Sequence, residues 1–371
     1  MCRWRRVPIS RLCTPPALLA LLLTCAIVAS VACNAAPPPP TIGTPTSTKT
    51  AAVADVPVAA LPTGALPGDL AMVVNRSVLV AAASGQRREI AQAPSAGPVY
   101  PAHPAWSPDG VSVAYVQKTF STGVPGVDWG DDVLLVPAAG GAPRMLRKHA
   151  QFGEQVQGLA WTPDGGSLLI GRIVTLFKDG QISGLRADIV RIDARAGGQE
   201  QVVTDGGFMP SLSRDGTRMA YLGLRDLFSE VVVANGDGNA RRVLIGADVF
   251  VSVMFPRVSP DGTRIVFAAG NPRSQSREYR GGSLLRGVLA WLRPTPAYAH
   301  GVPMDIWQVD VASGQMRVIA PLAEDEPMPV WSADGKTLVV FATGGIYRMN
   351  ADGSGLIRLG DGAFGGQVDL R

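Results

Sequence analysis

The stretch Pro104-Ala105-Trp106-Ser107-Pro108-Asp109-Gly110 returns in altered form four more times along the chain. The later copies end in Thr162-Pro163-Asp164-Gly165, Ser213-Arg214-Asp215-Gly216, Ser259-Pro260-Asp261-Gly262 and Ser332-Ala333-Asp334-Gly335. The intervals between successive aspartates are similar for the first four copies and longer before the last one. A period of about 40 to 50 residues is typical of a propeller blade, and loops of unequal length explain the spread.

Each copy of the motif predicts a tight β-turn. Ser or Thr opens the turn, Pro presets φ, Asp hydrogen-bonds the local backbone, and Gly accepts a positive φ. A strand-like run follows each turn, at residues 113–116, 168–170, 219–222, 265–267 and 338–341. A second run then leads to a turn of small residues. One repeat therefore encodes four antiparallel strands, a to d in chain order, and the five turn aspartates are structural.

These motifs resemble the repeats of TolB-like (WD40-like) β-propellers, over residues 69–371. The resemblance implies an all-β fold of four-stranded antiparallel blades. It does not imply an activity, because propellers of this type include binding platforms, enzyme gates and enzymes. The α/β domain of TolB has no counterpart in this sequence, so the resemblance implies no role in the Tol system.

The number of blades follows from the two ends of the repeat region. Residues 70–74 and 78–80 read as strands b and c without a preceding Asp-Gly turn, and residues 366–370 read as the missing strand a. Pairing of these segments closes the ring and removes exposed sheet edges. We therefore expect six blades, with seven as the alternative.

Residues 1–68 predict export and a lipid anchor. An Arg-rich start precedes an apolar run at 17–32, which suits a signal peptide better than a spanning helix. Ser30-Val31-Ala32-Cys33 resembles a bacterial lipobox, although Leu is usual at the position of Ser30, and assigns lipidation to Cys33. An uncleaved anchor and ordinary secretion are the alternatives. Residues 33–68, with eight prolines after Cys33, predict a disordered tether.

Composition excludes several classes of function. The arginines at positions 3, 5, 6 and 11 account for the whole net charge of +4, so the rest of the chain is neutral, and the positive excess of segment 271–303 is balanced by a negative excess elsewhere. This is not the continuous basic face that nucleic acids need. All four cysteines precede Asn34, so the propeller has no thiol chemistry. No Gly-x-Ser-x-Gly elbow, phosphate-binding loop or metal-ligand pattern is present, and we expect no cofactor and no catalytic residues.

The predicted contact surface lies in the b–c and d–a loops, which share one end of the propeller, called the top face below. The insertion 271–303 can form an amphipathic helix at 284–293, which covers the propeller mouth, docks a partner or lies on a membrane. The candidate binding residues are Trp129, Arg286, Trp291, Arg293, Tyr298, His300, Glu324, Asp325 and Glu326.

Two acidic loops and two histidines carry the remaining alternatives. Asp128, Asp131 and Asp132 surround Trp129, and we expect most of these acids to be solvated and to bind no metal. His103 and His300 are expected in loops. If either histidine met top-face carboxylates near the axis, the chain would suit a glycan lyase or hydrolase. The favoured hypothesis is a non-enzymatic module that binds an envelope protein or glycan, and a structural spacer is the third.

Overall fold

A computed structural model of the chain describes residues 62, 64–94, 99–119, 129–179, 181–225, 228–270, 272, 302–362 and 367–371. Within these residues the chain forms 24 β-strands and no helix. The strands belong to six four-stranded antiparallel sheets. The leader, Cys33, the tether and most of the insertion 271–303 lie outside the described residues.

The six sheets are the blades, and the strands of each are named in order from a to d. Blade 1 joins the two ends of the chain and consists of β24 (Gln367–Leu370), β1 (Leu70–Val74), β2 (Ser77–Ala81) and β3 (Arg87–Gln92). Blade 2 consists of β4 (Val99–Trp106), β5 (Ser112–Thr119), β6 (Asp132–Pro137) and β7 (Arg144–Arg147). Blade 3 consists of β8 (Glu154–Trp161), β9 (Ser167–Lys178), β10 (Gln181–Asp193) and β11 (Gln201–Asp205).

The second half of the chain repeats the same order. Blade 4 consists of β12 (Gly207–Leu212), β13 (Arg218–Arg225), β14 (Phe228–Asn235) and β15 (Arg242–Ile245). Blade 5 consists of β16 (Val253–Val258), β17 (Arg264–Ala269), β18 (Met304–Asp310) and β19 (Met316–Glu324). Blade 6 consists of β20 (Met328–Trp331), β21 (Thr337–Ala342), β22 (Gly345–Asn350) and β23 (Ile357–Gly360).

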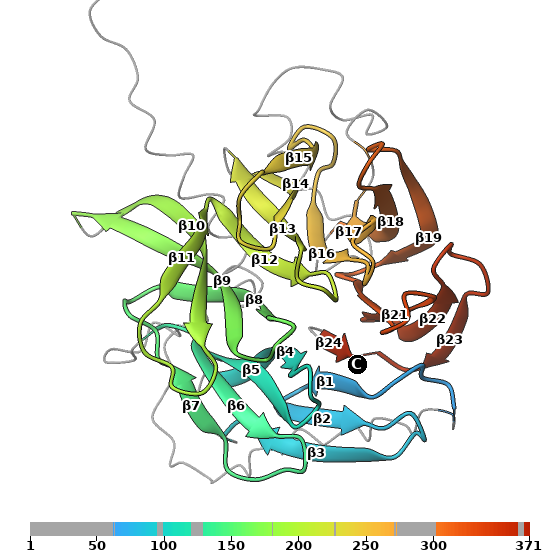
Figure 1. The fold of residues 1–371 in the computed structure, drawn as a ribbon, viewed down its shortest axis with the longest axis horizontal. Helices are drawn as coiled ribbons and strands as arrows, with labels where there is room; N and C mark the ends of the chain where they lie inside the picture. The colour runs from blue at the N-terminus through green and yellow to red at the C-terminus, as the bar shows by residue number, and fades with distance from the viewer. Residues whose placement is uncertain are drawn as a thin grey trace, which may run out of the picture. The chain divides into compact units, whose positions relative to one another are not determined.

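The ring closes through its ends, as the sequence predicts. Strand β1 pairs with β2 on one side and with β24 on the other, where Leu70 faces Leu370 and Met72 faces Val368. The a strands contact one another in ring order, from β24 through β4, β8, β12, β16 and β20 back to β24. Figure 1 shows the six sheets around a common centre, with β24 beside β1. Six blades are therefore confirmed, and the alternative of seven is wrong.

The five Asp-Gly turns have the predicted geometry and connect strands a and b. In the first, Ser107 Oγ donates to Asp109 Oδ1 at 2.6 Å, and the same oxygen accepts the Val111 amide at 3.0 Å. Ser107 Oγ also accepts the Ser112 amide at 3.0 Å, while Gly110 takes a φ of 70°. These bonds favour the carboxylate form, so they lower the pKa of Asp109 below its ordinary value. The other four turns repeat the pattern.

The b–c connection of blade 3 differs from the loop that the length of this segment predicts. The sequence predicts a long loop near residues 174–187, but β9 continues to Lys178 and β10 begins at Gln181. Thr175–Leu185 belongs to a different compact unit from the rest of the propeller. Within it, Ser183 Oγ donates to the Leu176 carbonyl at 3.2 Å. Backbone pairing within β-branched and apolar sequence replaces the loop.

Candidate functional site

The a strands of blades 2 to 5 share a backbone irregularity. The pairing of β4, β8, β12 and β16 with their b strands shifts in register at the same place in each blade. At that place the backbone is left-handed, with φ of 47° at His103, 101° at Gly158, 53° at Met209 and 53° at Phe255. Such bulges re-aim neighbouring side chains, and a left-handed bulky residue is strained. The irregularity is therefore a shared feature of the repeat, and it lies on the a strands, which contact one another around the ring.

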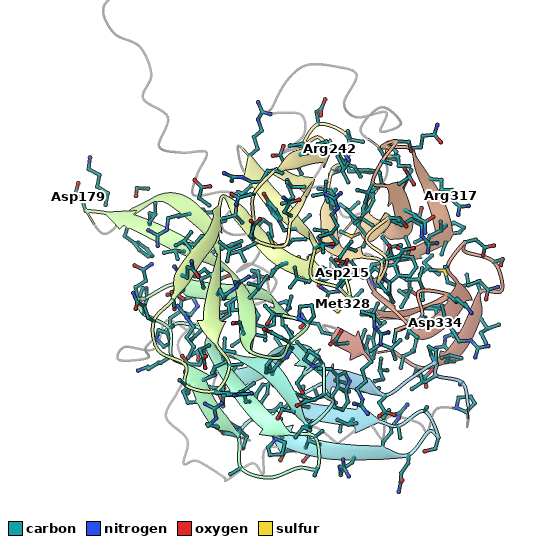
Figure 2. All side chains as sticks on the ribbon, in the orientation of Figure 1. Asp179, Asp215, Arg242, Arg317, Met328 and Asp334 are labelled. Carbon is teal, nitrogen blue, oxygen red and sulfur yellow. The ribbon has the colours of Figure 1, made fainter. Side chains whose placement is uncertain are left out.

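Polar side chains from four blades meet around this axis. We call His103, Gln157, Arg257 and Asp369 the axial cluster. His103 is only 5% exposed, and its amide donates to the Gln367 side-chain oxygen. Asp369 Oδ2 accepts the Trp106 amide at 2.7 Å. Met328, from blade 6, lies near the centre of the ring in Figure 2, and its sulfur accepts the Val368 amide at 3.3 Å.

The members of the axial cluster perturb one another electrostatically. Burial, with the positive charges of Lys118 and Arg257, lowers the pKa of His103 well below 6.5, and a side-chain hydrogen bond to Gln157 opposes this shift. Burial lowers the pKa of Arg257, against the attraction of Asp369. Burial raises the pKa of Asp369, against the attraction of Arg257. His103 is therefore neutral at pH 7 and sits in the field of the partly buried Arg257.

Two nitrogens of the axial cluster have no hydrogen-bond partner. They are His103 Nε2 and Arg257 Nε, both shielded from solvent. Arg257 forms no ion pair with any described residue, although its charge is felt by both His103 and Asp369. A buried donor without a partner costs about 1 to 3 kcal/mol, and more when it is charged. This arrangement is suited to holding a small polar ligand.

A second group of buried charges joins blades 2 and 3, and we call it the interblade ion cluster. It contains Arg147, Glu154, Arg172, Asp188 and Glu200. Arg147 pairs with Glu154 and Glu200, and Arg172 pairs with Asp188 and with Glu200 Oε2 at 2.7 Å. Burial opposes the charge of Arg172, but the hydrogen bond and attraction of Asp188 raise its pKa overall. Because each charge has an opposite partner, this cluster holds the two blades together.

The acids expected around Trp129 are only partly as predicted. Asp128 lies outside the described residues, whereas Asp131 and Asp132 are buried. Asp131 pairs with Lys118 Nζ at 3.3 Å and accepts the Val156 amide at 2.9 Å. Asp132 pairs with His149 Nδ1 at 2.7 Å. The expectation of solvated acids is therefore wrong for these two, because each satisfies donors at the junction of blades 2 and 3.

The predicted binding residues on the top face are not brought together by the described part of the chain. Trp129, in the b–c connection of blade 2, packs edge-on against Phe152 at 5.3 Å between ring centroids. Glu324 ends strand d of blade 5 and accepts the Gly344 amide at 2.9 Å and the Tyr347 hydroxyl at 2.5 Å. Blades 2 and 5 are not neighbours in the ring.

The other predicted contact residues add little to this surface. Asp325 and Glu326 follow Glu324, and Glu326 has a left-handed φ of 46°. Residues of the insertion lie outside the described part, namely Arg286, Trp291, Arg293, Tyr298 and His300. The top-face hypothesis therefore stays a prediction.

An open groove of about 300 Å³ lies at the junction of blades 3 and 4. Asp205, Tyr221, Glu230 and Arg241 contribute its polar lining. Arg241 Nη1 pairs with Asp205 at 2.9 Å, with both side chains largely exposed. Since an exposed pair is worth little and already satisfies both charges, the groove is a weaker candidate than the axial cluster.

Neither a metal centre nor a membrane-spanning helix occurs in the part of the chain that the structure describes. It contains no group of three or more His, Cys, Asp or Glu side chains that could hold a metal ion. The same residues also contain no helix with the length and hydrophobicity needed to cross a membrane.

Sequence reasoning missed three members of the axial cluster, although a signal was present. The position before the motif's Trp or apolar residue holds Ala105, Ser211 and Val330 in other blades, but Arg257 in blade 5. Ser211 Oγ accepts the Val258 amide of the next blade at 3.1 Å, as Asp369 accepts the Trp106 amide. Asp369 thus occupies the same repeat position, and a charge there departs from the repeat.

Comparison with known proteins agrees with the fold. No family model matches the chain, and no curated protein matches it. Among solved structures, TolB from Acinetobacter baumannii superposes with a TM-score of 0.55 at 17% identity, over 81% of this chain and 66% of that one. The chain therefore spans just under two thirds of that protein's length.

Two further structures show the same likeness. A putative TolB from Agrobacterium tumefaciens gives a TM-score of 0.51 at 18% identity, over 78% of this chain and 88% of that one. A chain of a nidogen/laminin complex gives a TM-score of 0.53 at 11% identity, over 81% of this chain and 97% of that one. Identities this low show the fold and not the activity. The chain is therefore a six-bladed β-propeller of the TolB-like fold.

Proposed function

We propose that this chain is an exported, lipid-anchored propeller that binds a ligand or partner at the bacterial cell envelope and catalyses no reaction. The observation that carries the binding role is the axial cluster. Residues that repeat from blade to blade build the fold, whereas Arg257 and Asp369 depart from the repeat and meet His103 and Gln157 at the axis. Two of their nitrogens have no partner.

The leader supports the proposed location. An Arg-rich start, an apolar run, Cys33 after small residues and a proline-rich tether match a lipoprotein that holds its folded body away from a bilayer. Replacing Cys33 by alanine is expected to release the chain from the membrane fraction and to abolish incorporation of labelled fatty acid. Unchanged membrane association without label would overturn lipid anchoring.

The axial cluster favours binding over catalysis. General acid–base catalysis needs a proton donor and a proton acceptor that share one substrate. His103 bonds Gln157 rather than a carboxylate, and Asp369 accepts the Trp106 amide. A glycan lyase or hydrolase therefore has weaker support than a binding module.

Crosslinking and pull-down from native membranes test the proposal. The intact lipoprotein is compared with a variant lacking residues 272–302, with Arg257→Met, and with the control Arg214→Met. Arg214 lies in the a–b turn of blade 4 and is not a member of the axial cluster; its Nη1 donates to the Ala333 carbonyl at 2.9 Å. A partner lost in either of the first two variants, with folding preserved, supports a binding module. Cleavage of an envelope glycan that disappears in Arg257→Met would instead establish an enzyme.

A further inference from the structure

Arg257 carries a positive charge that the folded chain leaves without a direct counter-ion. Its side chain is partly buried, its carbonyl accepts Trp331 Nε1 at 3.0 Å, and its Nε has no partner. Asp369 attracts it, but no ion pair joins the two side chains within the described residues. Removing a guanidinium from water costs several kcal/mol unless an anion and hydrogen bonds offset the cost. A ligand that brings an anion to the axis would offset it.

His103 supplies a second, independent observation. Its side chain is nine-tenths buried, its Nε2 has no partner, and its backbone is held in a left-handed conformation. A buried polar atom without a partner has lost its hydrogen bonds to water, and a ligand at the axis would restore one.

The surrounding charges define the ligand that fits. Lys118 is already paired with Asp131, so Arg257 is the cation left without a partner among the described axial residues. The carboxylate of Asp369 lies within the same field and would repel a dianion. A guanidinium binds a carboxylate through two parallel hydrogen bonds, one of which can come from Nε. A monoanionic carboxylate therefore suits the site better than a phosphate.

We infer that the axial cluster binds the carboxylate of a small ligand or of a peptide C-terminus, with Arg257 donating through its guanidinium. This inference rests on the proposed binding role and names its ligand chemistry. A bridging water is the alternative occupant, since a polar site of this kind can hold one. The inference predicts that wild-type protein saturates with carboxylates at concentrations where chloride has no effect.

Isothermal titration of the full-length chain in detergent tests the inference. The probes are propionate, ethylamine, and one short peptide with either a free or an amidated C-terminus. Propionate binding identifies a small acid, and binding of the free peptide alone identifies a chain terminus. Arg257→Met is expected to weaken carboxylate binding by roughly 30-fold or more, because a buried charge-assisted pair is lost. Arg214→Met is expected to bind as wild type does.

Thermal unfolding without ligand separates a binding role from a structural one. If Arg257 awaits a ligand, Arg257→Met raises the midpoint or leaves it unchanged, because an unpaired buried charge is removed. No carboxylate binding by wild type, equal binding by Arg257→Met, or a lowered midpoint without a binding defect would overturn the inference. A membrane partner still lost in the 272–302 deletion would then leave the proposed function intact. Carboxylate binding without any envelope partner would support the carboxylate site and contradict the proposed role in binding an envelope partner.

Discussion

Replacing Glu154 by glutamine tests whether the interblade ion cluster joins blades 2 and 3. The Glu154 side chain is 1% exposed and pairs with Arg147, which is 4% exposed. Glutamine removes the charge but keeps an oxygen for the Ala150 amide, which donates to Glu154 Oε2 at 3.2 Å. The substitution therefore removes the charge with almost no change in side-chain volume, and it turns an amide NH2 toward Arg147.

The expected loss of stability follows from what remains around Arg147. Breaking a buried pair costs about 3 to 5 kcal/mol, because the other charge is left uncompensated. Arg147 still pairs with Glu200, which is 25% exposed and better solvated. We therefore expect a loss of stability at the lower end of this range, about 3 kcal/mol. Arg147→Met is expected to cost about as much, since Glu154 then keeps only Arg172, at 3.8 Å.

A double-mutant cycle by urea unfolding supplies the measurement. The variant carrying both substitutions is expected to lose about 1 to 2 kcal/mol, so the coupling is about 4 kcal/mol or more. Asp205→Asn is the matched control, because it breaks the exposed pair with Arg241 and should cost less than about 1 kcal/mol. Additivity of the two single changes within about 0.5 kcal/mol would refute the reasoning.

Three further predictions concern the axis and the closure of the ring. Because the pKa of His103 is lowered in the folded state, this side chain binds a proton below pH 6.5 in the unfolded chain but stays neutral in the folded chain. Stability is therefore lost on acidification, by up to about 1.4 kcal/mol per pH unit, and His103→Asn should flatten this slope relative to wild type in urea titrations at pH 5 to 7. Gly158→Ala places a Cβ 2.9 Å from the Met209 backbone, so calorimetry should show a larger loss than for Gly140→Ala, which meets nothing within 4 Å; equal losses would contradict the steric argument. Deleting residues 367–371 leaves the edge of β1 unpaired and removes two buried side chains worth about 3 to 6 kcal/mol, so the shortened chain should unfold without cooperativity or associate in gel filtration, and a monomer of wild-type stability would exclude closure by β24.

Most of the fold could be predicted because its signals are local. Ser107, Asp109 and Gly110 form their turn within a few positions of one another, so sequence spacing alone locates it. Chain closure was also predictable, since residues 366–370 have strand character and no other partner in their repeat. The extended β9–β10 hairpin was not, because apolar residues near 174–187 suit a long strand as well as a loop.

The axial cluster could be predicted less well. His103 looked like a loop residue because the proline after it hides the strand, yet it lies in β4 and is buried. Arg257 and Asp369 lie in repeats far apart along the chain, and neither has a motif of its own. Only their departure from the blade repeat marked them, and that departure does not give distance or burial.

The sequence by itself determined the turns, the strand order, the four-stranded blades and the pairing of the chain ends. Each of these depends on residues close together in the chain or on the number of copies of the repeat. Tertiary structure alone decided which charges are buried and which of them have partners. Ring closure brings one residue from each of several distant blades to a common axis, and desolvation there depends on all the blades at once. His103, Gln157, Arg257 and Asp369 became a candidate site only through that closure.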